Sequence, residues 1–214
     1  MANWAVFLKD ERGFTLVEVV VVVAVVGILA LIVVAIATDK ILTAKIVAAE
    51  SDIKSLATAI ASFYQDTGEF PARTVAGKNK IEVLRSSNDS SLDPEFATGL
   101  PALWGLTETD EINNHLLIDN PGGTANGYRN NNVKWNGPYI GDIGRDPWGR
   151  NYLIIARGFY DPGTAVLPIF AWIISGGPNK TIETDIKSEI LNSNTALNVS
   201  TEDDDVGFLL FTSE

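Results

Sequence analysis

The sequence predicts an α+β protein in which a long N-terminal α-helix packs on a small antiparallel β-sheet. Three observations predict it. A nearly continuous apolar run covers residues 14–37, and apolar residues then recur at every third or fourth position through residues 38–66. Three stretches rich in β-branched and aromatic residues follow in the C-terminal half. We therefore expect a transmembrane half and an amphipathic half of one helix, and then a globular domain at residues 67–214.

Residues 14–37 are long enough to cross a bilayer as a helix, because 24 residues at about 1.5 Å each exceed the roughly 30 Å hydrocarbon core. Valine dominates the run, but lipid offers the backbone no other hydrogen-bond partner, so helix is imposed. The run is too long for a secretory signal peptide. A plain membrane anchor explains its length and leaves Glu18 unexplained, since a carboxylate costs about 2.5–3.5 kcal/mol at mid-membrane. We expect Glu18 to have a partner.

Residues 9–18, which read K-D-E-R-G-F-T-L-V-E and lead into the apolar run, resemble the class III signal of type IV pilins and of the pseudopilins of type II secretion. The resemblance implies that a prepilin peptidase cuts between Gly13 and Phe14 and that the new N-terminus at Phe14 is N-methylated. Residues 1–13 would be a discarded leader. The leader holds two basic and two acidic residues, so the net charge of −11 would not change.

Cleavage gives Glu18 a physical role. It creates an α-amino cation at Phe14 of one subunit, which Glu18 of a neighbouring subunit can neutralise when the apolar helices pack side by side. An unpaired ion in such a bundle is strongly disfavoured, so subunits that dock out of step are penalised. We expect this pair to set the register of assembly.

The amphipathic half places its apolar residues on one helical face, and D-T-G at 66–68 with Pro71 predicts where the helix ends. A coiled coil is the alternative. Residues 50–71 are similar to the pseudopilin pattern in which this helix packs on the sheet. Many family members have proline where Ala35 stands, so unwinding near Gly27 or Ala35 on assembly stays open. The face comprises Leu42, Ile46, Ala49, Ile53, Leu56, Ile60 and Phe63.

The globular domain shows strand character at 152–156, 166–174 and 206–212, which predicts an antiparallel meander covered by the apolar face of the helix. Residues 72–134 give no confident assignment of elements. W-N-G-P-Y-I-G-D-I-G-R-D-P-W-G-R-N-Y at 135–152 resembles the signature of major pseudopilins, and the resemblance implies a pilin fold. We expect Asp146 to cap the turn before Pro147 and Trp148 to pack in the core.

Residues 175–184 and 203–206 are the best candidate for a metal site, because they offer hard oxygen ligands and neither cysteine nor histidine. They resemble the calcium loop of major pseudopilins. The resemblance gives Asn179 the place of a loop acid, Thr184 the hydroxyl position, Asp204 and Asp205 the acidic pair, and Ile182 a backbone carbonyl. Asn179 is neutral where an acid is common, and residues 185–202 are an insertion. A solvated acidic turn is the alternative.

The composition limits the possible partners. Asp and Glu number 27 against 16 Lys and Arg, and no basic cluster occurs, so we expect no nucleic acid partner. The absence of cysteine excludes disulfides and thiolate zinc sites. No nucleophile and base stand in a recognisable arrangement, and we expect no enzymatic activity.

The sequence thus predicts a structural subunit of a helical pilus-like filament, with the major pseudopilin of a type II secretion system as the preferred interpretation. The expected partners are further copies of the chain, a prepilin peptidase, an inner-membrane assembly platform, minor pseudopilins and, before assembly, membrane lipid. We expect a single pass through the bacterial inner membrane with the C-terminal domain outside the cytoplasm, and then a periplasmic or extracellular filament. The alternatives are a type IV pilus subunit, serving adhesion, motility, DNA uptake or a surface filament, and a non-polymerising membrane-tethered binding protein.

Overall fold

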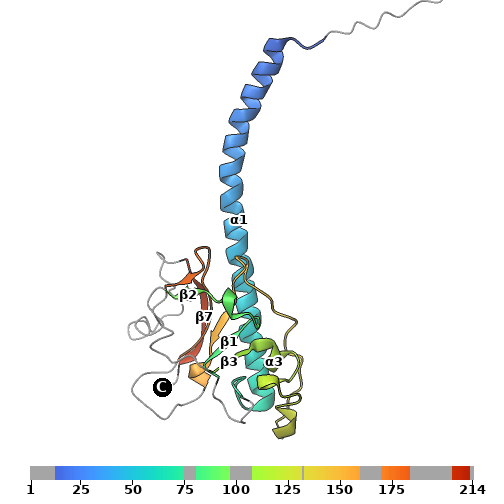
Figure 1. Cartoon of the computed structure of the whole chain (residues 1–214), viewed down its shortest axis with the longest axis vertical. Coiled ribbons are helices and arrows are strands. Elements are labelled where there is room, and N and C mark those ends of the chain that lie inside the picture. Colours follow the sequence, from blue (N-terminus) through green and yellow to red (C-terminus); the bar gives the residue numbers. More distant parts are fainter. Residues whose placement is uncertain are drawn as a thin grey trace, which may run out of the picture. The chain divides into compact units, whose positions relative to one another are not determined.

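The computed structural model describes residues 13–74, 81–96, 108–131, 133–159, 170–183 and 204–212 (Figure 1). The predicted leader at residues 1–12, the predicted ligand Thr184 and part of the predicted strand at 166–174 lie outside the described residues. The chain divides into one unit that ends at Thr43 and a second that begins at Ala44, and each is described by itself.

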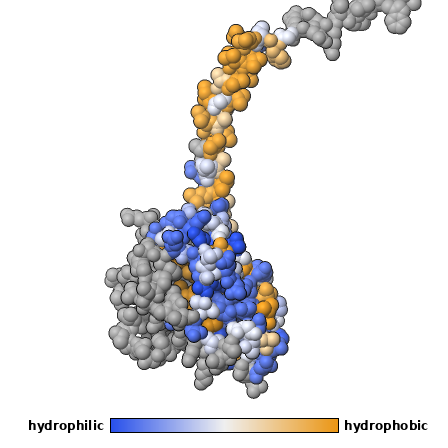
Figure 2. Space-filling model, in the orientation of Figure 1, coloured by the Kyte–Doolittle hydropathy of each residue, from blue (hydrophilic) through white to orange (hydrophobic). Residues whose placement is uncertain are grey.

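Helix α1 spans Leu16–Thr67, and its part up to Thr43 belongs to the first unit. The side chains of this part are exposed; Phe14, just before the helix, is 87% exposed and Val23 is 65% exposed. Figure 2 shows a nearly continuous hydrophobic surface along this segment. In the described part of the chain, α1 is the one helix long and apolar enough to cross a membrane, with a mean hydropathy of 3.5 in its most apolar window.

The part of α1 that belongs to the second unit buries the predicted apolar face. Ile53, Leu56 and Phe63 are at most 2% exposed and lie in the main core cluster. The face is therefore used for packing within the subunit, as the similarity to the pseudopilin pattern implies, whereas Leu42, in the first unit, is 41% exposed. The helix ends as predicted, because Gly68 adopts a φ of +75° and its N–H donates to the carbonyl of Tyr64 at 2.8 Å.

A five-stranded sheet has the order β3-β1-β4-β5-β7. Strand β4 confirms the predicted strand at 152–156 without its first and last residues, and β7 spans the full predicted range 206–212. Strand β5 confirms the described part of the predicted strand at 166–174 and extends it to Ser175. The two further strands, β1 and β3, come from the region without a sequence assignment and have three residues each. They pair in parallel while the other pairs are antiparallel, so the sheet is mixed. The long connection between them lets the chain return in the same direction. The bounds are β1 Val83–Arg85, β3 Thr109–Glu111, β4 Leu153–Ile155, β5 Phe170–Ser175 and β7 Val206–Thr212.

Smaller elements complete the described part. Strands β2 (Glu95–Phe96) and β6 (Thr181–Ile182) form a separate parallel pair. The short α-helix α3 spans Ile112–Leu116. Four 3₁₀ turns join the other elements: η1 Ser90–Leu92, η2 Pro121–Gly123, η3 Arg129–Asn131 and η4 Ala156–Phe159.

The core lies on both faces of the sheet, as the two-residue period of strands requires. Leu84, Ile154 and Ile173 belong to the same cluster as the buried residues of α1. Their neighbours Val83, Ile155 and Trp172 belong to a second cluster. The arrangement is α+β, a long helix with a small mixed sheet, which is consistent with a pilin fold.

Candidate functional site

The start of α1 carries Thr15 and Glu18 in a capping box. The carboxylate atom Oε2 of Glu18 accepts the backbone N–H of Thr15 at 3.1 Å and its hydroxyl at 3.0 Å, while the N–H of Glu18 donates to the Thr15 hydroxyl at 3.2 Å. The sequence predicts a partner for Glu18 in a neighbouring subunit, and the structure shows a further partner, Thr15, within the same chain. The signal was present, since T-x-x-E before an apolar run is the pattern of such a cap.

The predicted cleavage point lies just before this cap. Gly13 and Phe14 are exposed and precede the helix, and no atom lies within 4 Å of a Cβ placed on Gly13. A peptide bond in this setting is geometrically accessible to a peptidase. Cleavage and methylation at these residues, and the pairing of Glu18 with a neighbouring amine, stay predictions.

The acidic loop, residues 177–183 with Asp204 and Asp205, brings together segments far apart in the sequence. Asp204 Oδ2 accepts the N–H of Asn179 at 2.9 Å, and Asp205 Oδ2 accepts the N–H of Glu183 at 3.0 Å. Ile182 lies in β6 between these contacts, with a fully buried side chain. The structure thus gathers Asn179, Ile182, Asp204 and Asp205, the predicted calcium ligands that lie within the described residues, into one region.

The acidic loop offers oxygen atoms, the type of ligand that a hard cation binds. Asp204 Oδ1 is buried without a hydrogen bond among the described residues, which is the state of an oxygen that a cation can satisfy. Asn179 Oδ1 already accepts the N–H of Thr181 at 2.7 Å. Over the described ranges, no three His, Cys, Asp or Glu side chains gather closely enough to hold a metal ion. A calcium ion at this place would therefore take only part of its ligands from the described carboxylates, and the remainder would be backbone oxygens and residues such as Thr184, which lies outside the described residues.

The turn at residues 146–149 is capped by Asp146, as predicted. Asp146 Oδ1 accepts the N–H of Trp148 at 3.0 Å and that of Arg150 at 2.7 Å, and Gly149 adopts a φ of +86°. Trp148 is half-buried and packs against the main core cluster. The side chain of Asp146 therefore organises this turn.

A buried polar cluster surrounds His115, which is fully buried. Its Nδ1 contacts the hydroxyl of Tyr128 at 2.5 Å, and its Nε2 contacts Asp110 Oδ2 at 3.1 Å. Burial raises the pKa of Asp110, but hydrogen bonds and charge from His115, with further bonds from Gly122 and Asn114, outweigh it and hold that pKa below its ordinary value. The cluster fixes the loop at residues 119–131. Sequence reasoning missed it because its members share no spacing pattern.

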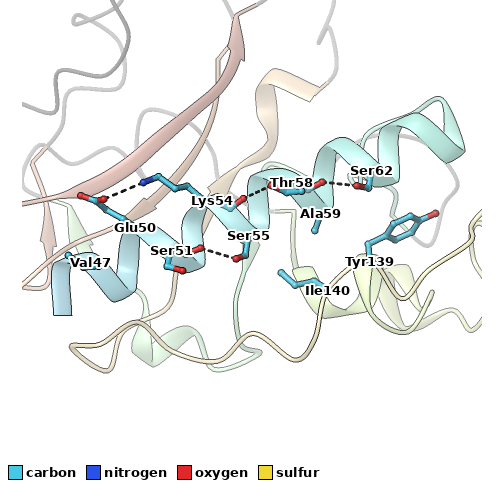
Figure 3. A pocket seen from close by; sticks show the side chains of 10 residues that line it. All are labelled: Val47, Glu50, Ser51, Lys54, Ser55, Thr58, Ala59, Ser62, Tyr139 and Ile140. Carbon is cyan, nitrogen blue, oxygen red and sulfur yellow. Dashed lines mark hydrogen bonds and ion pairs between the residues drawn. The ribbon is translucent and has the colours of Figure 1, made fainter. Parts of the chain in front are cut away.

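An open groove of about 580 Å³ runs along α1 between Val47 and Ser62, with Tyr139 and Ile140 on its other side (Figure 3). Three of its hydroxyls are engaged within the helix: those of Ser55, Thr58 and Ser62 donate to the carbonyls four residues earlier, at 2.8–3.0 Å. Lys54 lies 3.4 Å from Glu50. The groove is therefore lined by a mixture of small hydroxyl side chains, one ion pair and a few apolar side chains.

Comparison with known proteins gives one match. A family model described as the prokaryotic N-terminal methylation motif matches residues 8–34. No curated protein and no solved structure matches the chain. The matched residues contain the predicted cleavage point, the Thr15–Glu18 cap and most of the exposed apolar helix. The match covers the start of α1, and the long helix with a small mixed sheet is consistent with a pilin fold. The match supports a type IV pilin-like family and a precursor that a prepilin peptidase processes, and the anchoring helix suits the inner membrane.

Proposed function

We propose that this chain is the major pseudopilin of a type II protein secretion system, a structural subunit that polymerises into a helical filament. The observation that carries the filament role is the exposed apolar part of α1, most of which lies within the residues that the N-terminal methylation motif matches. So much apolar surface requires either lipid or other helices as its environment. In this proposal the apolar part of α1 lies in lipid before assembly and packs against the helices of other subunits in the filament.

The proposed assembly uses the N-terminal residues in sequence. The precursor inserts into the inner membrane with its C-terminal domain outside the cytoplasm, and a prepilin peptidase removes residues 1–13. The α-amine of Phe14 then pairs with Glu18 of a neighbouring subunit. Both hydrogen bonds that Thr15 donates to Glu18 end on Oε2, which leaves Oε1 to face an incoming amine. The pair holds the register, and helix packing supplies most of the association energy.

Calcium is the proposed cofactor of the acidic loop. Asp204 and Asp205 would supply carboxylate oxygens, with Thr184, the amide of Asn179 and the carbonyl of Ile182 as further ligands. A bound cation would link the loop to the segment that begins β7 and would satisfy the buried Oδ1 of Asp204. In a chain without disulfides, a ligand that binds the folded state alone raises its stability.

The preference for a pseudopilin rests on the D-P-W-G turn and the acidic loop, which resemble the major pseudopilin pattern. A type IV pilus subunit is the second candidate, because the N-terminal motif is shared by both classes. The partners of a pseudopilin would be the assembly platform and minor pseudopilins. Imaging filaments in the native host with and without the secretion genes separates the two candidates.

Mass spectrometry of the chain isolated from its native membrane tests the filament role first. We expect the mass of residues 14–214 plus one methyl group. A Gly13→Leu variant serves as the control and should keep the leader, because the peptidase requires the glycine in this family. A wild-type chain that retains residues 1–13 would support a non-polymerising membrane-tethered protein instead.

A further inference from the structure

The D-P-W-G turn and the acidic loop are joined by one buried serine. Ser175 ends strand β5 and is fully buried. Its hydroxyl donates to Asp146 Oδ2 at 2.6 Å, and the same hydroxyl oxygen accepts the N–H of Gly177 at 3.2 Å. The two motifs, 29 residues apart at this contact, therefore form one hydrogen-bonded unit.

Asp146 gives this serine a fixed anchor. The carboxylate is 4% exposed, and its other oxygen accepts two backbone N–H groups of the turn, from Trp148 and Arg150. Because both oxygens are engaged by donors, the carboxylate cannot rotate without leaving buried polar groups unsatisfied. The hydroxyl of Ser175 is consequently held in one direction, with its oxygen lone pairs available to Gly177.

Gly177 is the point where the loop meets the acidic pair. It adopts a φ of +56°, and a Cβ at this position would overlap the backbone oxygen of Asp204. Two residues later, Asn179 donates its N–H to Asp204 Oδ2 at 2.9 Å. The hydrogen bond from Gly177 to Ser175 therefore fixes the start of the loop segment that orients Asp204.

We propose that Ser175 and Asp146 are positioning residues for the cation site at Asp204 and Asp205. This inference rests on the calcium binding proposed above. The two residues act through the loop backbone and are not ligands themselves. Groups that orient metal ligands typically change metal affinity by about 10- to 100-fold when they are removed, because the ligands no longer start from the binding geometry.

Calorimetric titration of calcium chloride into the full mature chain in detergent, after treatment with a chelator, tests the proposal. The variant Ser175→Ala should raise the calcium Kd by about 10- to 100-fold. The matched control is Ser86→Ala. Ser86 is 1% exposed and its hydroxyl oxygen also accepts one backbone N–H, from Tyr152 at 3.1 Å, but among the described residues it makes no hydrogen bond to the acidic loop. This control should lower the melting temperature and leave the calcium Kd unchanged.

Asp146→Asn provides a second, independent variant in case Ser175→Ala does not fold. The amide keeps one oxygen for the turn but places an N–H₂ group against the hydroxyl of Ser175, so it should also raise the calcium Kd. Wild-type affinity in either folded variant overturns the positioning role while the calcium site stands. An equal loss of affinity in Ser86→Ala also overturns it, since the effect would then be general destabilisation. A wild-type chain that binds no calcium overturns both the site and the inference.

Discussion

The two parts of helix α1 differ in what their apolar residues do. In the first unit apolar side chains face outward all round the helix, and Val23 is 65% exposed. In the second unit one face is buried, and Phe63 is fully buried in contact with Tyr128 and Tyr139 at ring-centroid distances of 4.9 and 5.4 Å. Packing within the subunit therefore stabilises the part of α1 in the second unit. The part in the first unit depends on surroundings outside the subunit, such as lipid or other helices.

Truncation of apolar residues in the two parts gives the sharpest contrast. Phe63→Ala should lower the free energy of unfolding of the detergent-solubilised chain by about 3–5 kcal/mol, because it removes a buried aromatic ring. Val23→Ala should leave it unchanged, since this side chain is 65% exposed and belongs to neither core cluster. Chemical denaturation followed by tryptophan fluorescence measures both. Equal losses in the two variants would contradict the division of roles.

Glu18 tests what the exposed part of the helix is for. Glu18→Gln should be processed normally, but its filament yield should fall by tenfold or more, a loss of about 1.4 kcal/mol per contact at the least. Thr15→Val is the matched variant, because it removes the hydroxyl cap and keeps the carboxylate. It should assemble better than Glu18→Gln. Filament yield is measured by sedimentation and negative-stain imaging; normal filaments from Glu18→Gln would refute the pairing.

The stability of the second unit is expected to depend on pH through Asp110. Its pKa is lower in the folded state than its ordinary value, so its contribution to stability is present above that ordinary value and is lost as the pH falls through the folded-state pKa. Asp110→Asn should therefore lower stability at neutral pH and flatten the acid limb of the stability profile. The control is Asp142→Asn, which also removes an aspartate, one that accepts an N–H from the side chain of Asn113. An unchanged acid limb in Asp110→Asn would contradict this assignment.

The smallest effect is expected at the contact between Asp52 of α1 and Tyr152, the residue just before β4. The hydroxyl of Tyr152 donates to Asp52 Oδ2 at 2.8 Å, and burial together with this carboxylate raises the pKa of Tyr152 far above its ordinary value. Tyr152→Phe should cost about 1 kcal/mol in unfolding free energy, the typical worth of one hydrogen bond. Asp52→Ala should cost about the same, and the double variant should show that the two effects are not additive. Additive losses would show that the bond contributes nothing.

The long elements of the fold were predictable from the sequence, and the shortest strands were not. Helix α1 and strand β7 follow from hydrophobic runs long enough to show a period. Strands β1 and β3 have three residues each and depend on pairing with distant partners, so no local pattern marks them. The parallel pairing of β1 and β3 also depends on tertiary contacts, so the sequence did not predict it.

The candidate sites divide in the same way. The capping box at Thr15 and Glu18 is a local pattern that the sequence contains, so it was predictable, although only an intermolecular partner was predicted for Glu18. Asn179, Asp204 and Asp205 came together as the resemblance implied. The bond between Ser175 and Asp146 was not predictable, because it joins two motifs through tertiary structure.

Imaging the assembled filament at near-atomic resolution tests the central claim most directly. The account predicts that the α-amine of Phe14 lies about 3 Å from a carboxylate oxygen of Glu18 in a neighbouring subunit, the distance of a charge-assisted hydrogen bond. A filament in which Glu18 bonds within its own subunit alone, while the neighbouring amine lies beyond the reach of an ion pair, would contradict it.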